Sequence, residues 1–168
     1  RDGFVMAEGA CSFVVEEYEH AKRRGAVILA EVTGWSLTSE AYHMTTPRPD
    51  GAPLRAAIEQ ALDSARLRPE QIDYISPHAS STQANDVHEC LQIAQVFGSC
   101  IRNIPISGTK AFTGHTLGAA GALEAAICLL AMRHDFVPPT LHLTDPDPAL
   151  GDFDLVPLHA REAKLNHI

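Results

Sequence analysis

The chain has 168 residues, of which 45% are apolar, and its formal net charge is −8 at pH 7. This length and composition can bury one substantial core, so we expect one domain or a large piece of one. The negative charge argues against nucleic-acid backbones and anionic membranes as partners. The sequence shows no apolar run near membrane-spanning length and no signal-peptide pattern, so we expect a cytoplasmic, globular protein without membrane contacts.

The four cysteines and nine histidines do not form a metal-binding pattern. Cys11, Cys90, Cys100 and Cys128 lie far apart without a C-x-x-C spacing, and we expect free thiols that behave as small apolar side chains. The histidines lack the close spacing of a zinc site. We therefore expect neither a disulfide nor a bound metal.

The N-terminal part of the chain alternates strand-like and helix-like segments. Residues 10–16 and 26–37 are rich in β-branched side chains, which predicts two strands. Between them, residues 17–24 are polar and are followed by Gly25, which indicates a short helix. Prolines and glycine predict a loop over 38–53, and a one-sided apolar pattern predicts a helix over 54–67.

The rest of the chain continues this alternation. Short apolar runs predict strands at 72–75, 104–106 and 153–156. A helix is predicted from Asn85 or Asp86 to about Phe97, and a buried helix over about 117–134. Residues 136–140 contain two prolines and predict a loop or edge segment. The alternation of strands and helices indicates the α/β class.

The stretch from residue 104 to residue 126 has the features of a functional site. A buried strand leads through a polar turn to Lys110 and His115, and an apolar helix follows. Chemical groups of α/β proteins gather at such places, where strands end and helices begin. Gly114, Gly118 and Gly121 remove side chains where a backbone or a substrate must pass closely.

Four segments resemble motifs of one enzyme family. RDGFVMAEGA resembles RDGFVxGEGA, and SPHASSTQANDVHE resembles NAHGTSTxxND. SGTKAFTGHTLGAAGALEA resembles STKxxxGHxxGAAG, and VPPTLHLTDPDP resembles the family's PPTLN segment. The matches follow the family's order over nearly the whole chain. The chain thus resembles the C-terminal half of a β-ketoacyl-[acyl carrier protein] synthase, or ketosynthase, a condensing enzyme of the thiolase-like superfamily.

The resemblance implies a fold and a reaction. The fold would be a layered, thiolase-like α/β half-fold with a mixed sheet flanked by helices. The reaction would be a decarboxylative Claisen condensation, in fatty-acid or polyketide synthesis, between an acyl thioester on a cysteine and malonyl-acyl carrier protein. Partners would be the acyl carrier protein, acyl and malonyl thioesters and, for the full-length enzyme, a second copy in a homodimer. No resident cofactor is implied, because the carrier protein brings the phosphopantetheine.

The resemblance also assigns roles to four residues. His78 and His115 match the two histidines that hold the malonyl thioester carbonyl while carbon dioxide leaves. Lys110 matches the motif lysine and Glu89 its accompanying glutamate, and we expect these two to form a partly buried ion pair. Two neutral imidazoles can each donate to one developing oxyanion. The helix start after His115 and the nearby Lys110 both favour a neutral His115 ring.

Some residues depart from the family pattern. Pro77 and Ala79 stand where the motif has alanine and glycine, and Ala7 stands where glycine is usual. Alanine adopts a positive φ less readily than glycine, so either the Ala79 loop has a negative φ or the site has shifted. The nucleophile-bearing N-terminal half and the final glycine-rich segment of the family are not matched within residues 1–168. We therefore expect a C-terminal ketosynthase fragment that is inactive alone.

Other interpretations stay open. The chain could be a chain-length-factor-like subunit that pairs with an active synthase, or an isolated domain that only folds and binds. Both histidines and Lys110 favour the synthase, because a subunit without chemistry needs no convergent donors. The glycines at 114 and 118 and the pair Tyr18-x-x-x-Lys22 also resemble short-chain dehydrogenases, but the pair precedes the glycines and no acidic ribose ligand follows.

Overall fold

The computed structural model describes residues 3–168. Its α-helices are α1 (Tyr18–Arg23), α2 (Ala52–Ala65), α3 (Asp86–Phe97), α4 (Lys110–Thr113) and α5 (Ala120–His134). Its 3-10 helices are η1 (Pro69–Gln71), η2 (Gly98–Asn103), η3 (Leu117–Ala119) and η4 (Pro148–Leu150). Its strands are β1 (Phe136–Val137) and β2 (Arg161–Glu162).

Short extended segments at the centre of the molecule are joined by isolated parallel bridges. Ile75 pairs with Ile106, and Pro105 with Asp154, both in parallel bridges. The amide of Ile75 donates to the Pro105 carbonyl at 3.0 Å, and that of Ile106 donates to the Asp154 carbonyl at 2.8 Å. β1 and β2 add an antiparallel pair. The three strands predicted at 72–75, 104–106 and 153–156 therefore meet, although each contributes only isolated bridges.

The core has one apolar cluster on each side of these segments. The first cluster consists of Tyr74, Ala131, Val137, Val156 and Leu165. The second consists of Ile93, Phe97, Ile101, Ile104 and Ile106. Successive residues of an extended chain point to opposite faces, so Tyr74 joins the first cluster while Ile75 packs against the second. α5 covers one face through Ala131 and α3 covers the other, which confirms the predicted α/β class.

The predicted helices form with small changes of boundary. α3 spans the predicted residues, and α2 begins two residues before the predicted start at residue 54. The helix predicted over 117–134 forms as η3 and α5, but the expectation that it is buried is wrong. Leu117 and Leu130 remain 52% and 51% exposed. Only one face of α5 packs on the core.

The apolar helix also corrects an expectation about membrane-spanning length. The window Leu117–His134 has 18 residues and a mean hydropathy of 1.3, so by length and composition alone it could cross a membrane. A helix that packs on the core of a soluble protein meets the same test. α5 contacts the first cluster through the fully buried Ala131, while only 11% of the window is buried inside the structure.

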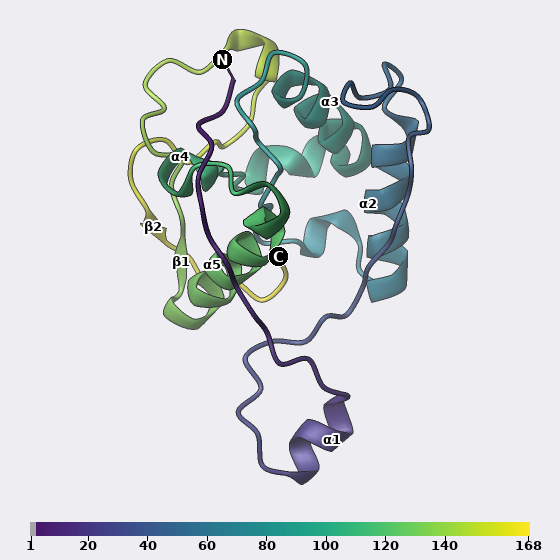
Figure 1. The fold of residues 1–168 in the computed structure, drawn as a ribbon, viewed down its shortest axis with the longest axis vertical. Coiled ribbons are helices and arrows are strands. Elements are labelled where there is room, and N and C mark those ends of the chain that lie inside the picture. The colour runs from purple at the N-terminus through teal and green to yellow at the C-terminus, as the bar shows by residue number, and fades with distance from the viewer. Residues whose placement is uncertain (1–2) are drawn as a thin grey trace.

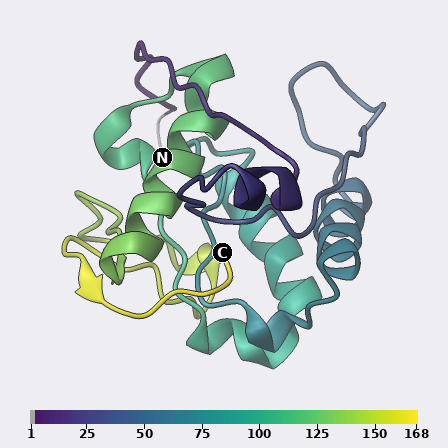
Figure 2. The same cartoon turned by 90° about the horizontal axis from the view of Figure 1, so that it is seen from below.

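The strands predicted at 10–16 and 26–37 do not form. Both segments are extended and connect the body to α1, which lies at the far end of the molecule (Figures 1 and 2). In the described chain, neither segment makes a backbone hydrogen bond to another segment along residues 8–16 or 27–37. Val14, Val27 and Trp35 are 86%, 85% and 72% exposed. The sequence pattern of a strand is present there, but its hydrogen-bonding partner is not.

Candidate active site

His115 is fixed by the N-terminal segment of the chain. Its amide donates to the Val5 carbonyl at 2.8 Å, and its carbonyl accepts from the Ala7 amide at 3.1 Å. The edge of the Phe4 ring lies against the imidazole, with ring centroids 4.6 Å apart. The His115 side chain is buried as a result. Sequence reasoning missed Phe4, although it lies within the first matched motif.

The hydrogen bonding of His115 leaves one ring nitrogen available as a donor. The Leu117 amide, at the start of η3, donates to Nδ1 of His115 at 3.1 Å. Nδ1 is then an acceptor, so a neutral ring carries its proton on Nε2. Burial lowers the pKa of His115 below 6.5, and Lys110 and His78 lower it further, while Glu124 acts in the opposite direction. The ring is a neutral Nε2–H donor near neutral pH, as predicted.

His78 follows the extended segment at Ile75, and its ring meets that of His115. Its ring lies across that of His115, with centroids 5.2 Å apart and an interplanar angle of 76°. In contrast to His115, the His78 residue is exposed. The two predicted histidines therefore converge, one held inside the protein and the other open to an incoming molecule.

Glu89, in the first turns of α3, holds the backbone of His78. Its two carboxylate oxygens accept from the amides of His78, at 2.7 Å, and Ala79, at 2.9 Å. The Asn85 side chain also donates to this carboxylate, at 3.1 Å. Glu89 is buried and has used both oxygens on the loop that carries His78. It positions that loop without contacting Lys110.

Lys110 pairs with a different carboxylate, so the predicted Lys110–Glu89 ion pair is wrong. The Lys110 ammonium forms an ion pair with Glu124 of α5 and donates to the His78 carbonyl at 2.6 Å. The side chains of Lys110 and Glu124 are only 6% and 16% exposed. Glu89 instead accepts from the His78 and Ala79 amides, while Glu124 of α5 lies next to the Lys110 ammonium. The signal for Glu124 was present in the sequence, as a single acidic residue inside an apolar helix.

The glycines and alanines of the site follow the local geometry. A Cβ on Gly114, which has φ +68°, would lie 2.7 Å from the Ala7 Cβ, so a side chain is excluded there. Apart from adjacent residues and its own helix, no described atom lies within 4 Å of a Cβ built on Gly118 or Gly121, so no other segment of the described chain passes closely there. Ala79 does adopt a positive φ, of 40°. The loop thus keeps a conformation that suits glycine.

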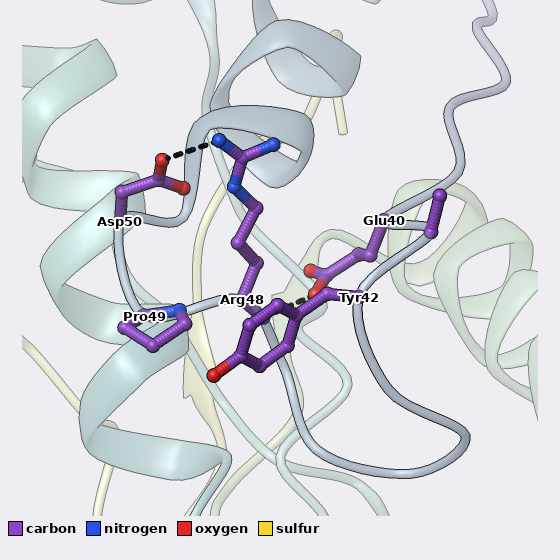
Figure 3. Close-up of a pocket in the computed structure, with 6 residues that line it drawn as sticks. Glu40, Tyr42, Arg48, Pro49 and Asp50 are labelled. Atoms are coloured by element: carbon purple, nitrogen blue, oxygen red, sulfur yellow. Dashed lines mark hydrogen bonds and ion pairs between the residues drawn. The ribbon is translucent and has the colours of Figure 1, made fainter.

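A separate pocket lies in the loop that precedes α2. It encloses about 320 Å³ between Glu40, Tyr42, Arg48, Pro49 and Asp50 (Figure 3). Arg48 forms an ion pair with Asp50 at 3.0 Å, and its amide donates to the Glu40 carboxylate. Arg48 and Asp50 are paired with each other, and the Glu40 carboxylate already accepts a backbone amide. Neither His78 nor His115 lines this pocket, so it belongs to the folding of the loop and lies apart from the histidine pair.

Sequence comparison identifies the family. The sequence model of the family described as "Beta-ketoacyl synthase, C-terminal domain" matches residues 29–144. The chain belongs to this family. It is 46% identical over all 168 residues to the 3-oxoacyl-[acyl-carrier-protein] synthase 2 of Coxiella burnetii. It is 44% identical over the same length to the tetracenomycin polyketide synthase ketoacyl synthase alpha subunit of Streptomyces glaucescens.

Solved ketosynthases have the same fold. The ishigamide ketosynthase/chain length factor superposes with a TM-score of 0.90 at 40% identity, over 97% of this chain and 39% of that one. A type II polyketide ketosynthase, solved with its acyl-carrier protein, superposes with a TM-score of 0.88 at 40% identity, over 98% of this chain and 40% of that one. The present 168-residue chain spans only about 40% of the length of the C. burnetii relative and 39% of that of the S. glaucescens relative.

Proposed function

We propose that residues 1–168 are the C-terminal portion of a condensing enzyme and supply its two decarboxylating histidines. The reaction is the decarboxylative Claisen condensation of an acyl thioester with malonyl-acyl carrier protein. The observation that carries this proposal is the histidine pair, with ring centroids 5.2 Å apart and the buried ring held as an Nε2–H donor. Two such donors suit an oxyanion that forms on a thioester carbonyl.

The chemical step follows from this arrangement. When the malonyl carboxylate leaves as carbon dioxide, the electrons of its carbon–carbon bond move onto the thioester enolate. His78 and His115 donate to the enolate oxygen, each worth about 3 kcal/mol in the transition state. The resulting carbanion attacks the acyl-cysteine carbonyl, a new carbon–carbon bond forms, and the cysteine thiolate leaves. In family members this cysteine belongs to the half that residues 1–168 do not match.

Lys110, Glu124 and Glu89 act as positioning residues in this proposal. Glu89 holds the amide side of His78 and Lys110 holds its carbonyl side. Glu124 neutralises the buried Lys110 ammonium and fixes it between the two histidine-bearing segments. A buried lysine without such a partner would tend to lose its proton. None of these three groups needs to exchange a proton with the substrate.

The remaining assignments extend the family likeness. We propose acyl carrier protein as the partner, as in the polyketide ketosynthase complex described above. Its phosphopantetheine would carry the substrate, with no resident cofactor in the ketosynthase. We further propose a full-length homodimer, a cytoplasmic location, a 3-oxoacyl-acyl carrier protein synthase activity and no condensation by residues 1–168 alone. Relatives of both the fatty-acid and the polyketide type leave both product classes as candidates.

A chimeric synthase tests the proposal. In this chimera, residues 1–168 replace the matching segment of the C. burnetii relative. We expect malonyl-acyl carrier protein decarboxylation and 3-oxoacyl product from the chimera. His78→Ala and His115→Ala should each slow decarboxylation by about a hundredfold or more, the effect of removing one oxyanion donor. Acylation of the cysteine should change less, because the loaded acyl group does not need that donor pair.

The exposed His134 at the end of α5 supplies the control. His134→Ala removes an imidazole of the same kind far along the helix from the pair and should leave the decarboxylation rate unchanged. If the His78→Ala or His115→Ala chimera decarboxylates at the parental rate, that residue has no part in the mechanism. An inactive parental chimera that is correctly folded would count against the condensing function itself.

A chain-length-factor-like role is the second candidate, because one structural neighbour is a ketosynthase/chain length factor assembly. The retained histidine pair, with its buried Lys110–Glu124 support, favours the synthase. A non-condensing subunit would gain nothing from two convergent donors. Under this second role the chimera would fold and associate with a partner synthase but would release no carbon dioxide from malonyl-acyl carrier protein.

A further inference from the structure

Two positions on facing loops of the site differ from the family motifs in opposite directions. Ala79 has a side chain where NAHGTSTxxND has glycine. Gly108 lacks a side chain where STKxxxGH has serine, when the two are aligned on Thr109 and Lys110. One loop has gained a methyl group and the other has lost a side chain. The structure places these two positions next to each other.

The two residues meet directly. A Cβ built on Gly108 would lie 3.0 Å from the Cβ of Ala79, and no other described atom would lie within 4 Å of it. Apolar carbons pack best at about 3.5–4.0 Å, so a methyl group at residue 108 would have to displace Ala79. The methyl group of Ala79 therefore occupies the space that a side chain at 108 would fill.

Hydrogen bonds hold both loops, so a shift of a few tenths of an ångström in either one strains them. The Gly108 amide donates to Thr140 Oγ1 at 3.1 Å. The Ala79 amide donates to Glu89 at 2.9 Å, and the preceding carbonyl, of His78, accepts from Lys110 at 2.6 Å. A push on Ala79 is consequently transmitted to His78, the adjacent residue. Ala79 is also held at φ 40°, where a small backbone rotation changes the direction of the His78 side chain.

We propose that the contact of Ala79 with Gly108 sets the position of the His78 ring relative to His115. Ala79 and Gly108 are positioning residues, and the inference rests on the proposed function of the histidine pair. The side chain at 79 and the missing side chain at 108 act as one unit. A methyl group is tolerated at one of these positions at a time.

A double-mutant cycle in the chimeric synthase tests the unit. Gly108→Ala, with Ala79 retained, should slow malonyl decarboxylation about tenfold, equal to ~1.4 kcal/mol of transition-state stabilisation. Acylation of the cysteine should keep its rate, so the ratio of the two rates changes, which a loss of folded protein would not cause. Ala79→Gly alone should have a small effect. Ala79→Gly combined with Gly108→Ala should restore decarboxylation to within about threefold of the parent.

The outcomes separate the contact from the function. The Gly108→Ala substitution is measured in two backgrounds, with Ala79 present and with Ala79→Gly. If it slows decarboxylation equally in both backgrounds, or in neither, the proposed contact is overturned. An inactive parental chimera would count against the proposed function, and the contact would then be measured by stability alone. In that case Gly108→Ala should lower the Tm only where Ala79 is retained, and equal Tm changes with and without Ala79→Gly would overturn it.

Discussion

At the scale of single residues, the site depends on which atoms each group has already used. Glu89 has both oxygens on backbone amides, and Nδ1 of His115 has accepted a backbone amide. The Lys110 ammonium pairs with Glu124, and the remaining donor of His115 is Nε2. These two assignments decide the charge and the hydrogen-bond direction at the place where the histidines meet.

The Lys110–Glu124 pair should control the acid limb of the decarboxylation rate. Lys110→Met removes a cation that lowers the pKa of His115, so the acid limb of the chimera should move to higher pH. Adding Glu124→Gln to the Lys110→Met variant then removes an anion that raises the same pKa, so the acid limb should move back to lower pH. The measurement is the pH dependence of malonyl decarboxylation for the two variants. Shifts in the same direction would contradict this electrostatic coupling.

The same pKa shift contributes to stability in a defined pH window. Folding lowers the pKa of His115 from its ordinary value of 6.5, so the unfolded chain binds more protons between these two pKa values. The contribution of His115 to stability is therefore complete above pH 6.5 and is lost as the pH falls toward the folded pKa. The pH dependence of the unfolding free energy should flatten in this window when His115 is replaced by phenylalanine.

The residues of the site were predictable where local motifs carried them. His78, His115, Lys110 and Glu89 all lie at or beside the histidine pair. The pairing of Lys110 was not predictable, because it depends on how many amides each carboxylate already accepts. That number depends on the turn after His78 and on the register of α3, which the sequence spacing leaves open.

At the scale of elements, helices were predicted well and strands poorly. α3 follows its apolar spacing and begins directly after Asn85, although the Asn85 side chain makes no capping hydrogen bond. The segments at 10–16 and 26–37 have the composition of strands, yet a strand exists only through hydrogen bonds to another segment. A local sequence pattern indicates a tendency to form a strand, but the segment that pairs with it lies elsewhere in the sequence or in another chain.

α3 also provides a test of the clamp on the His78 loop. Glu89→Gln keeps the size of the side chain but turns one acceptor oxygen into an NH₂ group that faces a backbone N–H. One of the amides of His78 and Ala79 would lose its partner, which should destabilise the chimera by about 1–3 kcal/mol. Denaturant unfolding measures this change, with Glu59→Gln on the exposed face of α2 as the matched control. A loss no larger than that of the control would show that the carboxylate is not needed.

At the scale of the whole molecule, apolar surface is concentrated on the two extended segments. Val14, Val15, Val27 and Leu37 are each more than four-fifths exposed. Exposed apolar patches on a soluble chain mark surfaces that are covered by other protein. Unpaired extended segments also present amides and carbonyls that another chain can bind.

We expect the 168-residue polypeptide to self-associate through these segments. Replacing Val14, Val27 and Trp35 together by threonine should weaken association at least about tenfold, because these three apolar side chains are largely exposed and lie on the two extended segments. Sedimentation equilibrium measures the association constant. Met44→Thr is the control, since this residue is 95% exposed but lies in the loop before α2. A monomer at every concentration would contradict the expectation.

The hold on His78 has a consequence for the entropy of substrate binding. Its amide is fixed by Glu89 and its carbonyl by Lys110, so the peptide units on both sides are ordered when the protein folds. Ordering one residue's backbone costs about 1–2 kcal/mol of conformational entropy, and this cost is incurred when the protein folds, before any ligand binds. Only the two side-chain torsions of the exposed ring remain to be ordered in the folded protein. Under the proposed function, the ring could adapt to a bound thioester while its point of attachment stays fixed.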